Sequence, residues 1–241
     1  MTSKTLQGKI AVITGASRGM GAAIAELFWQ EGATVILVGR EQSTLHAAID
    51  QWHGPGKENI YPLAADLSQI LEINRLHTWL DEKFPHINIW VNNAAGIIAK
   101  PFVEISSEEW QQLWAINVTA PWLCCQYAFK RMSTTGGSII NITSLSGVAN
   151  TEKFAGFSAY VSTKAALSGM TEALGAEGKA FGIRVNAIAP GTVDTQMLHQ
   201  VAPDLSVETK PKDIAPIALF LADDKQSGVM TGSIIPVFCN P

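Results

Sequence analysis

Charged residues are scarce in this chain. Of its 241 residues, 16% are Asp, Glu, Lys or Arg, against roughly 25% in an average soluble protein. The formal net charge is −4 and no run of basic residues occurs, so nucleic acid is not an expected partner. Hydrophobic residues make up 47%, which suits a large core and further apolar surface covered by partner subunits.

Long hydrophobic runs are also missing. No uninterrupted apolar stretch approaches the roughly 18 residues that a membrane-spanning helix needs. The first residues, MTSKTLQGKI, contain no apolar signal core. We therefore expect a cytoplasmic protein that does not bind a membrane.

Cysteine is rare, and the histidines are dispersed. The cysteines are Cys124, Cys125 and Cys239, an odd number with two adjacent members, so no disulfide framework is predicted. The five histidines show no metal-ligand spacing, and no metal site is expected.

Short β-branched segments alternate with longer segments of helical periodicity along the chain. Strands are predicted over residues 9–14, 34–38, 59–63, 87–92, 138–143, 183–189 and 233–238. Helices are predicted over residues 41–52, 69–84, 107–132, 158–181 and 211–222, after a first helix marked by Ile24, Leu27, Phe28 and Glu31. Residues 199–210 are predicted to form a mobile loop.

Strands that alternate with helices pair in parallel, because each crossover helix returns the chain to the same edge of the sheet. Continuous apolar strands such as residues 35–38 suit a sheet covered on both faces. The pattern predicts a single doubly wound Rossmann-type α/β domain over residues 1–241, with a parallel sheet of about seven strands.

A glycine-rich turn, TGASRGMG at residues 14–21, joins the first strand to the first helix. Gly15 permits a sharp turn, and Gly19 and Gly21 let the backbone approach a phosphate at the helix N-terminus. The spacing differs from the general dinucleotide fingerprint G-x-G-x-x-G. An ordinary turn is the alternative, and the position after the first strand favours a phosphate site.

The end of the second strand indicates which nucleotide is bound. An acid there would bind the adenosine ribose, but the chain has Gly39 and Arg40. Together with Arg18, Arg40 suits a 2′-phosphate, so NADP(H) is favoured over NAD(H). Glu41 would oppose that phosphate if it pointed inward. The alternative is that Arg40 is a solvated residue at the start of a helix.

Further motifs follow the later strands. Asp66 can accept a hydrogen bond from an adenine amino group or cap the next helix near Ser68, and both interpretations are kept. The others are VNNAAG at 91–96, NITSLSG at 141–147 and APGTVDT at 189–195. All lie where strands end, at the sheet edge where such folds bind ligands.

Tyr160 and Lys164 are four residues apart and share one helix face. A free tyrosine has a pKa of about 10, and a nearby ammonium favours the phenolate and lowers that pKa. A tyrosine tuned in this way exchanges a proton with a carbonyl or an alcohol near neutral pH. A surface pair is the alternative. Ser144, sixteen residues before Tyr160, is a candidate to bind the carbonyl oxygen, and Ser146 is its rival.

The chain resembles the short-chain dehydrogenase/reductase family over nearly its full length. The matching residues are Thr14, Gly15, Gly19, Gly21, Asp66, Asn92, Asn93, Ala94, Asn117, Ser144, Tyr160, Lys164, Pro190, Gly191 and Thr195. The late segments PKDIAPIALFLADD and MTGSIIPV are also similar to that family's closing helix and strand.

The resemblance implies a catalytic set. Tyr160 would be the general acid/base, Lys164 would tune it and bind the nicotinamide ribose, and Ser144 would orient the carbonyl. Asn117 would hold a water in a proton relay to Lys164; it is also an unusual residue for the middle of a helix, which agrees with a backbone irregularity. The implied cofactor-binding residues are Gly15, Ser17, Arg18, Gly19, Met20, Gly21, Arg40, Asp66, Leu67, Asn93, Ala94, Tyr160, Lys164, Pro190, Gly191, Val193 and Thr195.

Four departures from the family pattern stand out. Ala95 replaces the usual glycine, and the interval from Ser144 to Tyr160 is about three residues longer than in many relatives. The stretch from Met197 to Pro211 is short, which predicts a reduced substrate lid. The chain ends VFCNP instead of a glycine-rich segment.

The expected function is NADP(H)-dependent interconversion of a carbonyl, possibly of the 3-oxoacyl type, and a secondary alcohol. An apolar pocket is predicted from Ile97, Leu145, Phe154, Phe157, Val193 and Met197, which suggests a small, uncharged, hydrophobic substrate. The resemblance implies a homodimer or homotetramer, with helices beginning at Ser107 and Ser158 in the interface. The alternatives are a silent NAD(P)-binding regulatory or scaffold protein, an NAD-dependent alcohol dehydrogenase, and a nucleotide-sugar epimerase or dehydratase.

Overall fold

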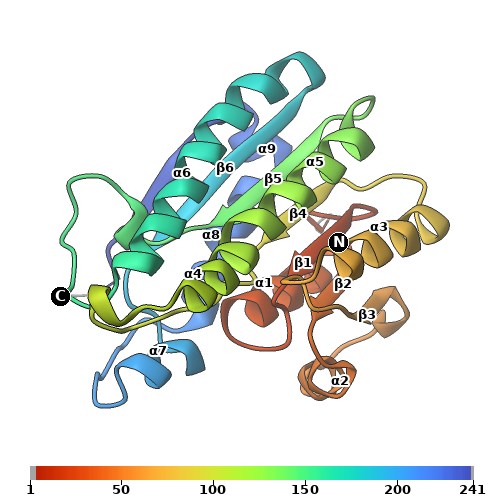
Figure 1. The fold of residues 1–241 in the computed structure, drawn as a ribbon. Coiled ribbons are helices and arrows are strands. Elements are labelled where there is room, and N and C mark those ends of the chain that lie inside the picture. The colour runs from red at the N-terminus through yellow and green to blue at the C-terminus, as the bar shows by residue number, and fades with distance from the viewer. Residues whose placement is uncertain (1–3, 240–241) are drawn as a thin grey trace.

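The computed structural model describes residues 4–239 and arranges their strands in one parallel sheet (Figure 1). The sheet has the order β3-β2-β1-β4-β5-β6-β7. Its strands are β1 Ile10–Thr14, β2 Thr34–Gly39, β3 Ile60–Ala64, β4 Ile89–Asn92, β5 Gly137–Ile142, β6 Ile183–Pro190 and β7 Ile234–Val237. The predicted α/β fold with a parallel sheet is confirmed, and each predicted strand is found with bounds shifted by no more than two residues.

The helices also follow the predicted order. They are α1 Gly19–Gln30, α2 Gln42–Asp50, α3 Ile70–Lys83, α4 Ser107–Trp114, α5 Ala120–Met132, α6 Ser158–Gly178, α7 Gln196–Val201, α8 Pro211–Ala222 and α9 Asp224–Ser227. Two predictions need correction. The helix predicted over 107–132 is divided by a π-helical turn, Ala115–Thr119, and part of the loop predicted over 199–210 belongs to α7.

Two helical layers enclose the sheet (Figure 1). On one face, Phe28 of α1, Leu45 of α2 and Leu221 of α8 belong to a single buried cluster. On the other face, Leu80 of α3 and Leu167 of α6 belong to a second cluster, to which α5 also contributes. Strand β2 is buried on both sides, which explains why it reads TVILVG, without the polar alternation of a half-exposed strand.

The strand order places the functional edge. From β1 the chain builds outward to β2 and β3, then returns to add β4 on the other side of β1. Ligands of doubly wound sheets bind at such a reversal, beyond the carboxyl ends of the strands. The turns that follow β1 and β4 meet there: Asn93 Nδ2 donates hydrogen bonds to the carbonyl oxygens of Thr14, at 2.9 Å, and Gly15, at 3.1 Å.

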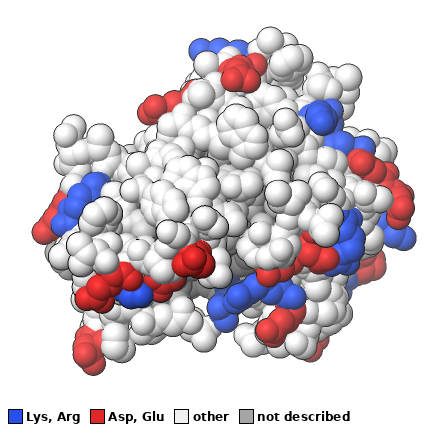
Figure 2. All heavy atoms as spheres, in the orientation of Figure 1, with Lys and Arg blue, Asp and Glu red and all other residues white. Residues whose placement is uncertain are grey.

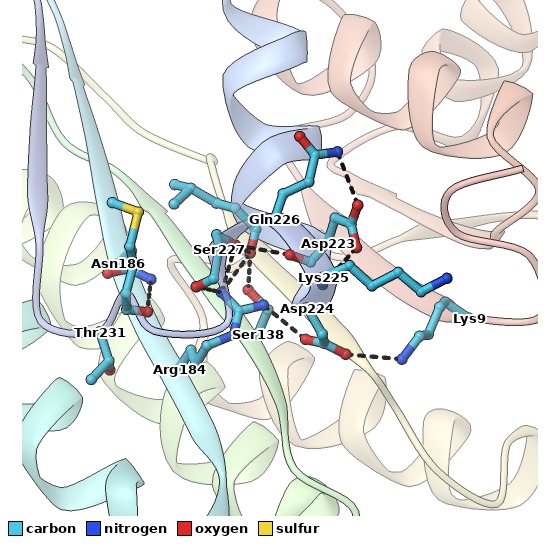
Figure 3. A network of polar contacts seen from close by, with 12 residues as sticks. Lys9, Ser138, Arg184, Asn186, Asp223, Asp224, Lys225, Gln226, Ser227 and Thr231 are labelled. Carbon is cyan, nitrogen blue, oxygen red and sulfur yellow. Dashed lines mark hydrogen bonds and ion pairs between the residues drawn. The ribbon is translucent and has the colours of Figure 1, made fainter.

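A buried guanidinium stabilises the opposite edge of the sheet (Figure 3). Arg184, at the start of β6, donates to the carbonyl oxygen of Leu221 at 2.9 Å and to Asp224 Oδ1 at 2.8 Å. Asp224 Oδ2 also accepts from Lys9 Nζ at 3.2 Å. The guanidinium thus meets the negative end of α8, where a cation is favourable. Among residues 4–239, none of the helices combines the length and hydropathy that crossing a bilayer requires.

Candidate active site

A crevice of about 480 Å³ opens at the carboxyl edge of the sheet, a size typical of small-molecule sites. Segments that follow β1 to β6 line it, so residues distant in sequence meet there. Of the predicted cofactor-binding residues, it is lined by Gly15, Ser17, Arg18, Gly19, Met20, Arg40, Asp66, Leu67, Asn93, Ala94, Tyr160, Lys164 and Thr195.

The glycine-rich turn is shaped for close approach of a ligand. Gly15 and Gly19 have φ values of +64° and +59°, in the left-handed region that favours glycine. A Cβ on Gly15 would lie 2.8 Å from Ala94 Cα, so this position also admits no side chain. The α1 N-terminus has no side-chain cap and no acid in its first turn. Its N–H groups can therefore bind a phosphate.

Arg18 and Arg40 both line the crevice, and both are exposed. Neither guanidinium forms a hydrogen bond or ion pair with another residue in the described part of the chain. Glu41 lines the same crevice, so a carboxylate lies in the same region as the two guanidiniums. The two guanidiniums have the N–H donors that a phosphate monoester requires.

Asp66 fulfils part of both interpretations made from the sequence. Its Oδ1 accepts hydrogen bonds from Ser68 N at 3.0 Å and from Ser68 Oγ at 2.8 Å, which fixes the turn before α3. The N-cap position of α3 is taken by Gln69. Asp66 also lines the crevice, where its carboxylate can accept a hydrogen bond from a ligand.

Tyr160 and Lys164, one turn apart on α6, both reach the crevice. Lys164 Nζ lies 5.7 Å from the centroid of the Tyr160 ring and donates a hydrogen bond to the Ile142 carbonyl oxygen at 2.9 Å. Burial lowers the pKa of Lys164 to about 8, because the charged form loses hydration.

The direction predicted for the tyrosine pKa is wrong for the protein alone. Burial raises the pKa of Tyr160 to about 12, and a side-chain hydrogen bond with Ser144 opposes the rise. The Lys164 ammonium is bound to a carbonyl oxygen and does not contact the phenol oxygen directly. The phenol is therefore protonated at neutral pH and can donate a proton.

Ser144 and Asn117 lie beside this pair without lining the crevice. Ser144 follows β5, and its hydroxyl accepts from Ser146 N at 3.1 Å. The Ser144 hydroxyl lies close enough to Tyr160 to lower the pKa of the phenol, which favours it over its rival, Ser146.

Asn117 lies in the π-helical turn, so the irregularity expected at this residue is present. Asn117 Oδ1 accepts from Gly96 N at 2.8 Å, and Nδ2 donates to Gly96 O and to Thr163 Oγ1, each at 3.0 Å. The side chain thereby joins the loop after β4 to α6, one residue before Lys164.

Four predicted cofactor-binding residues do not line the crevice. Gly21 is buried in the first turn of α1, where a Cβ would collide with Gly15 O, so its role is close packing. Pro190 ends β6, and Gly191 N donates to Val237 O at 2.9 Å. Val193 belongs to the buried core.

The predicted apolar pocket is only partly assembled. Ile97 and Met197 line the crevice, whereas Leu145, Phe157 and Val193 do not. Phe154 is also outside it, and 60% of its surface is exposed.

The sequence reasoning missed two amide side chains. Gln196 and Gln200, on α7, line the crevice beside Met197. Only residues 199–201 of this helix fall in the predicted loop, and no helix was predicted here, although Thr195, whose Oγ1 accepts from Leu198 N at 3.2 Å, is a typical N-cap residue.

Asp194, which precedes α7, forms ion pairs with one residue in α7 and with one that follows it. Asp194 contacts Lys210 Nζ at 2.7 Å and His199 Nε2 at 2.6 Å, and these partners hold its pKa below the usual range. Within the described residues, no group of three or more His, Cys, Asp or Glu is arranged to hold a metal ion.

Comparisons with known proteins show the family. Residues 9–206 match the family model of short chain dehydrogenases. A 3alpha-hydroxysteroid dehydrogenase from Mediterraneibacter gnavus is 33% identical, and the alignment covers 96% of each chain. A 3-oxoacyl-acyl-carrier-protein reductase from Thermotoga maritima is also 33% identical, over 96% of this chain and 97% of the relative.

Solved structures give the same result. A short-chain type dehydrogenase/reductase from Mycobacterium marinum has a TM-score of 0.88 at 30% identity, over 98% of this chain and 96% of its own. A protein from Escherichia coli, described as a short chain dehydrogenase and complexed with NADPH, has a TM-score of 0.89 at 26% identity over the whole of both chains. The protein studied here belongs to the short-chain dehydrogenase/reductase family of nicotinamide-dependent oxidoreductases.

Proposed function

We propose that this enzyme interconverts a carbonyl compound and a secondary alcohol with NADP(H), using Tyr160 as general acid/base. One observation carries the proposal: Arg18 and Arg40, whose guanidiniums have no partner among residues 4–239, line the same crevice as Tyr160 and Lys164. The cations follow β1 and β2, whereas Tyr160 and Lys164 come from α6, which follows β5. The crevice therefore offers phosphate donors in one region and a proton donor in another.

The residues of the crevice fit a nicotinamide dinucleotide. The uncapped start of α1 suits the pyrophosphate, and Arg18 and Arg40 suit a 2′-phosphate. The position at the end of β2 is Gly39, which has no carboxylate to bind a ribose hydroxyl or to repel the phosphate. Glu41 weakens this preference because it lines the same region. NADP(H) is the proposed cofactor, and NAD(H) is the alternative.

In the reducing direction, Tyr160 gives a proton to the carbonyl oxygen. The bound reduced cofactor supplies the hydride that the carbonyl carbon accepts. Ser144, whose hydroxyl lies near Tyr160, orients the carbonyl oxygen toward the phenol. Lys164 places a positive charge beside the phenolate that forms. Asn117 binds a water molecule that relays protons to Lys164.

The substrate class follows from the crevice walls. Ile97, Ile116 and Met197 present apolar surface, while Gln196 and Gln200 add uncharged amides. We therefore infer an uncharged, fairly hydrophobic ketone or aldehyde with at least one further hydrogen-bonding group. The hydroxysteroid dehydrogenase and 3-oxoacyl reductase among the relatives make steroid ketones and 3-oxoacyl thioesters the first compounds to test.

A homodimer or homotetramer is part of the proposal. Figure 2 shows a broad, largely uncharged surface over α4, α5 and α6. Trp110 and Trp122 are exposed there, by 39% and 54%, and the outer face of α6 carries small residues such as Ala165 and Ala173. Burying this surface against a second copy suits its composition. A monomer in light scattering at working concentration would contradict this.

A screen of carbonyl compounds tests the activity. Binding of NADPH and of NADH is measured first, by quenching of protein fluorescence. Steroid ketones, 3-oxoacyl thioesters and simple ketones are then added, and consumption of the reduced cofactor is followed by its absorbance. Tight cofactor binding without turnover on any compound would favour a silent binding protein.

A further inference from the structure

The loop that follows Ser144 is organised around a lysine ammonium. Lys153 Nζ donates to the carbonyl oxygen of Val148 at 2.7 Å and to that of Leu145 at 3.3 Å. It also donates to Thr151 Oγ1 at 2.6 Å. An ammonium has three N–H donors, so these three oxygens satisfy it completely.

The same two carbonyls are reached by a hydroxyl. Thr151 Oγ1 lies 2.5 Å from Leu145 O and 3.0 Å from Val148 O. The chain folds back to allow this at Asn150, which has a φ of 61° and is the one described residue other than glycine with a positive φ. Asparagine tolerates this conformation better than most residues. The longer interval before Tyr160 is therefore a compact, internally bonded loop.

The carbonyl oxygens of Leu145 and Val148 belong to the turn that begins at Ser144. We call residues 144–148 the Ser144 turn. Within it, Gly147 N donates to Ser144 O at 2.9 Å, and Val148 N donates to Leu145 O at 3.0 Å. On its other side, Gly147 lies so close to Lys164 that a Cβ would be 2.5 Å from the Lys164 carbonyl carbon. The turn is thus held by α6 on one side and by Lys153 on the other.

We propose that Lys153 is a positioning residue, which fixes the Ser144 turn and so directs the Ser144 hydroxyl toward Tyr160. This inference rests on the proposed carbonyl chemistry, since it assigns Lys153 a role in that reaction. Lys153 itself is exposed and does not line the crevice. It acts on the reaction through the turn.

The electrostatics favour this role. The last carbonyls of a helical turn carry partial negative charge, and a cation beside them is stabilising. Lys153 has no carboxylate within ion-pair distance among the described residues, so no acid competes for the ammonium. Because the side chain is exposed, water and salt weaken the contact, and a moderate effect is expected.

Hydrogen exchange on the protein alone tests the contact. Lys153→Met keeps the aliphatic chain and removes the charge, whereas Lys153→Arg keeps the charge. Lys179→Met is the matched control, since Lys179 is exposed beyond the far end of α6. Amide exchange across residues 145–148 is expected to be about five- to tenfold faster in Lys153→Met, and near wild type in the other two variants.

Turnover with the best carbonyl substrate tests the role. In Lys153→Met, kcat is expected to fall about five- to tenfold while KM for NADPH changes less than about twofold, and Lys153→Arg should restore kcat. Thr151→Val, which leaves the ammonium in place, should show the same pattern more weakly. Circular dichroism checks that each variant is folded. If Lys153→Met does not fold, the kcat of Thr151→Val decides whether the contact matters for turnover.

Two results would overturn the inference. One is unchanged exchange in Lys153→Met, or an equal increase in Lys179→Met. The other is faster exchange with unaltered kcat, which would make the contact structural only. If the wild-type enzyme reduces no carbonyl, the proposed function fails instead, and the exchange measurement still decides whether Lys153 holds the turn.

Discussion

Gly147 packs directly against the main chain of Lys164, so the turn that carries Ser144 rests on α6, the helix of Tyr160 and Lys164. A Cβ at position 147 would lie 2.5 Å from the carbonyl carbon of Lys164 and 2.8 Å from its Cβ. Neither main chain can move aside without shifting a functional side chain. Ser144 and Lys164 are therefore coupled by packing as well as by their shared contacts with Tyr160.

Replacing this glycine should impair catalysis more than folding. In Gly147→Ala, the added methyl group is expected to push the turn away from α6. We expect kcat to fall by about tenfold or more, and the free energy of unfolding to fall by about 1–3 kcal/mol. Ser146→Ala is the control, because the Ser146 side chain forms no hydrogen bond with Tyr160 and is not among the groups that shift its pKa. Normal kcat in Gly147→Ala, measured beside urea denaturation, would contradict the coupling.

Arg40 should determine the choice of cofactor. Arg40→Asp removes a phosphate donor and adds a carboxylate that can bind ribose hydroxyls. The ratio of kcat/KM for NADPH to that for NADH is expected to fall by about 100-fold or more. Lys212→Asp, an exposed charge reversal on α8, should leave the ratio unchanged. An unaltered ratio in Arg40→Asp would show that the phosphate assignment is wrong.

The rate of carbonyl reduction should decline in alkali. Burial lowers the pKa of Lys164 to about 8, so its ammonium is present below that pH and is lost above it. A plot of kcat/KM for NADPH against pH reports groups of the free enzyme. We expect a plateau below about pH 8 and a fall above it. A fall centred near 10.5, the value of an unburied lysine, would contradict the assignment.

Acid should destabilise the protein through His77. Burial lowers the pKa of His77 to about 4, and its ring stacks on Tyr127 at a centroid distance of 4.0 Å. Between about pH 6.5 and 4 the unfolded chain binds this proton and the folded protein does not, so stability falls as the pH falls.

In His77→Phe the stacking is kept and the proton site is removed. The loss of unfolding free energy between pH 7 and pH 5 should shrink by on the order of 1 kcal/mol. His53→Phe, at an exposed histidine, should retain the wild-type dependence. Urea denaturation at both pH values makes the comparison, and equal slopes in His77→Phe and wild type would refute the assignment.

Much of the fold was predictable because it depends on local patterns. Apolar β-branched runs such as β2 fit only a sheet buried on both faces, and their alternation with helices fixes parallel pairing. The motifs at the strand ends predicted that Gly15, Asp66 and Asn93 would lie at one edge of the sheet, and all three line the crevice. Thr195 could have predicted α7, but the six residues of that helix carry little periodic signal.

Other features depend on contacts that no local pattern encodes. The pKa of Tyr160 is raised by its burial, and Lys164 Nζ is held by the carbonyl oxygen of Ile142; neither fact follows from a four-residue spacing. Apolar character also did not distinguish Val193, which fills the core, from Met197, which lines the crevice. The loop around Lys153 depends on the left-handed conformation of Asn150, which one sequence does not specify.

Single-turnover reduction by Tyr160→Phe tests the central claim most directly. This change removes one hydroxyl and keeps the ring, so NADPH affinity, measured by fluorescence titration, should stay close to wild type. The rate of hydride transfer to the carbonyl should fall by about 100- to 10,000-fold, the usual contribution of a general acid. Transfer at a near-normal rate with NADPH bound would show that Tyr160 is not the proton donor.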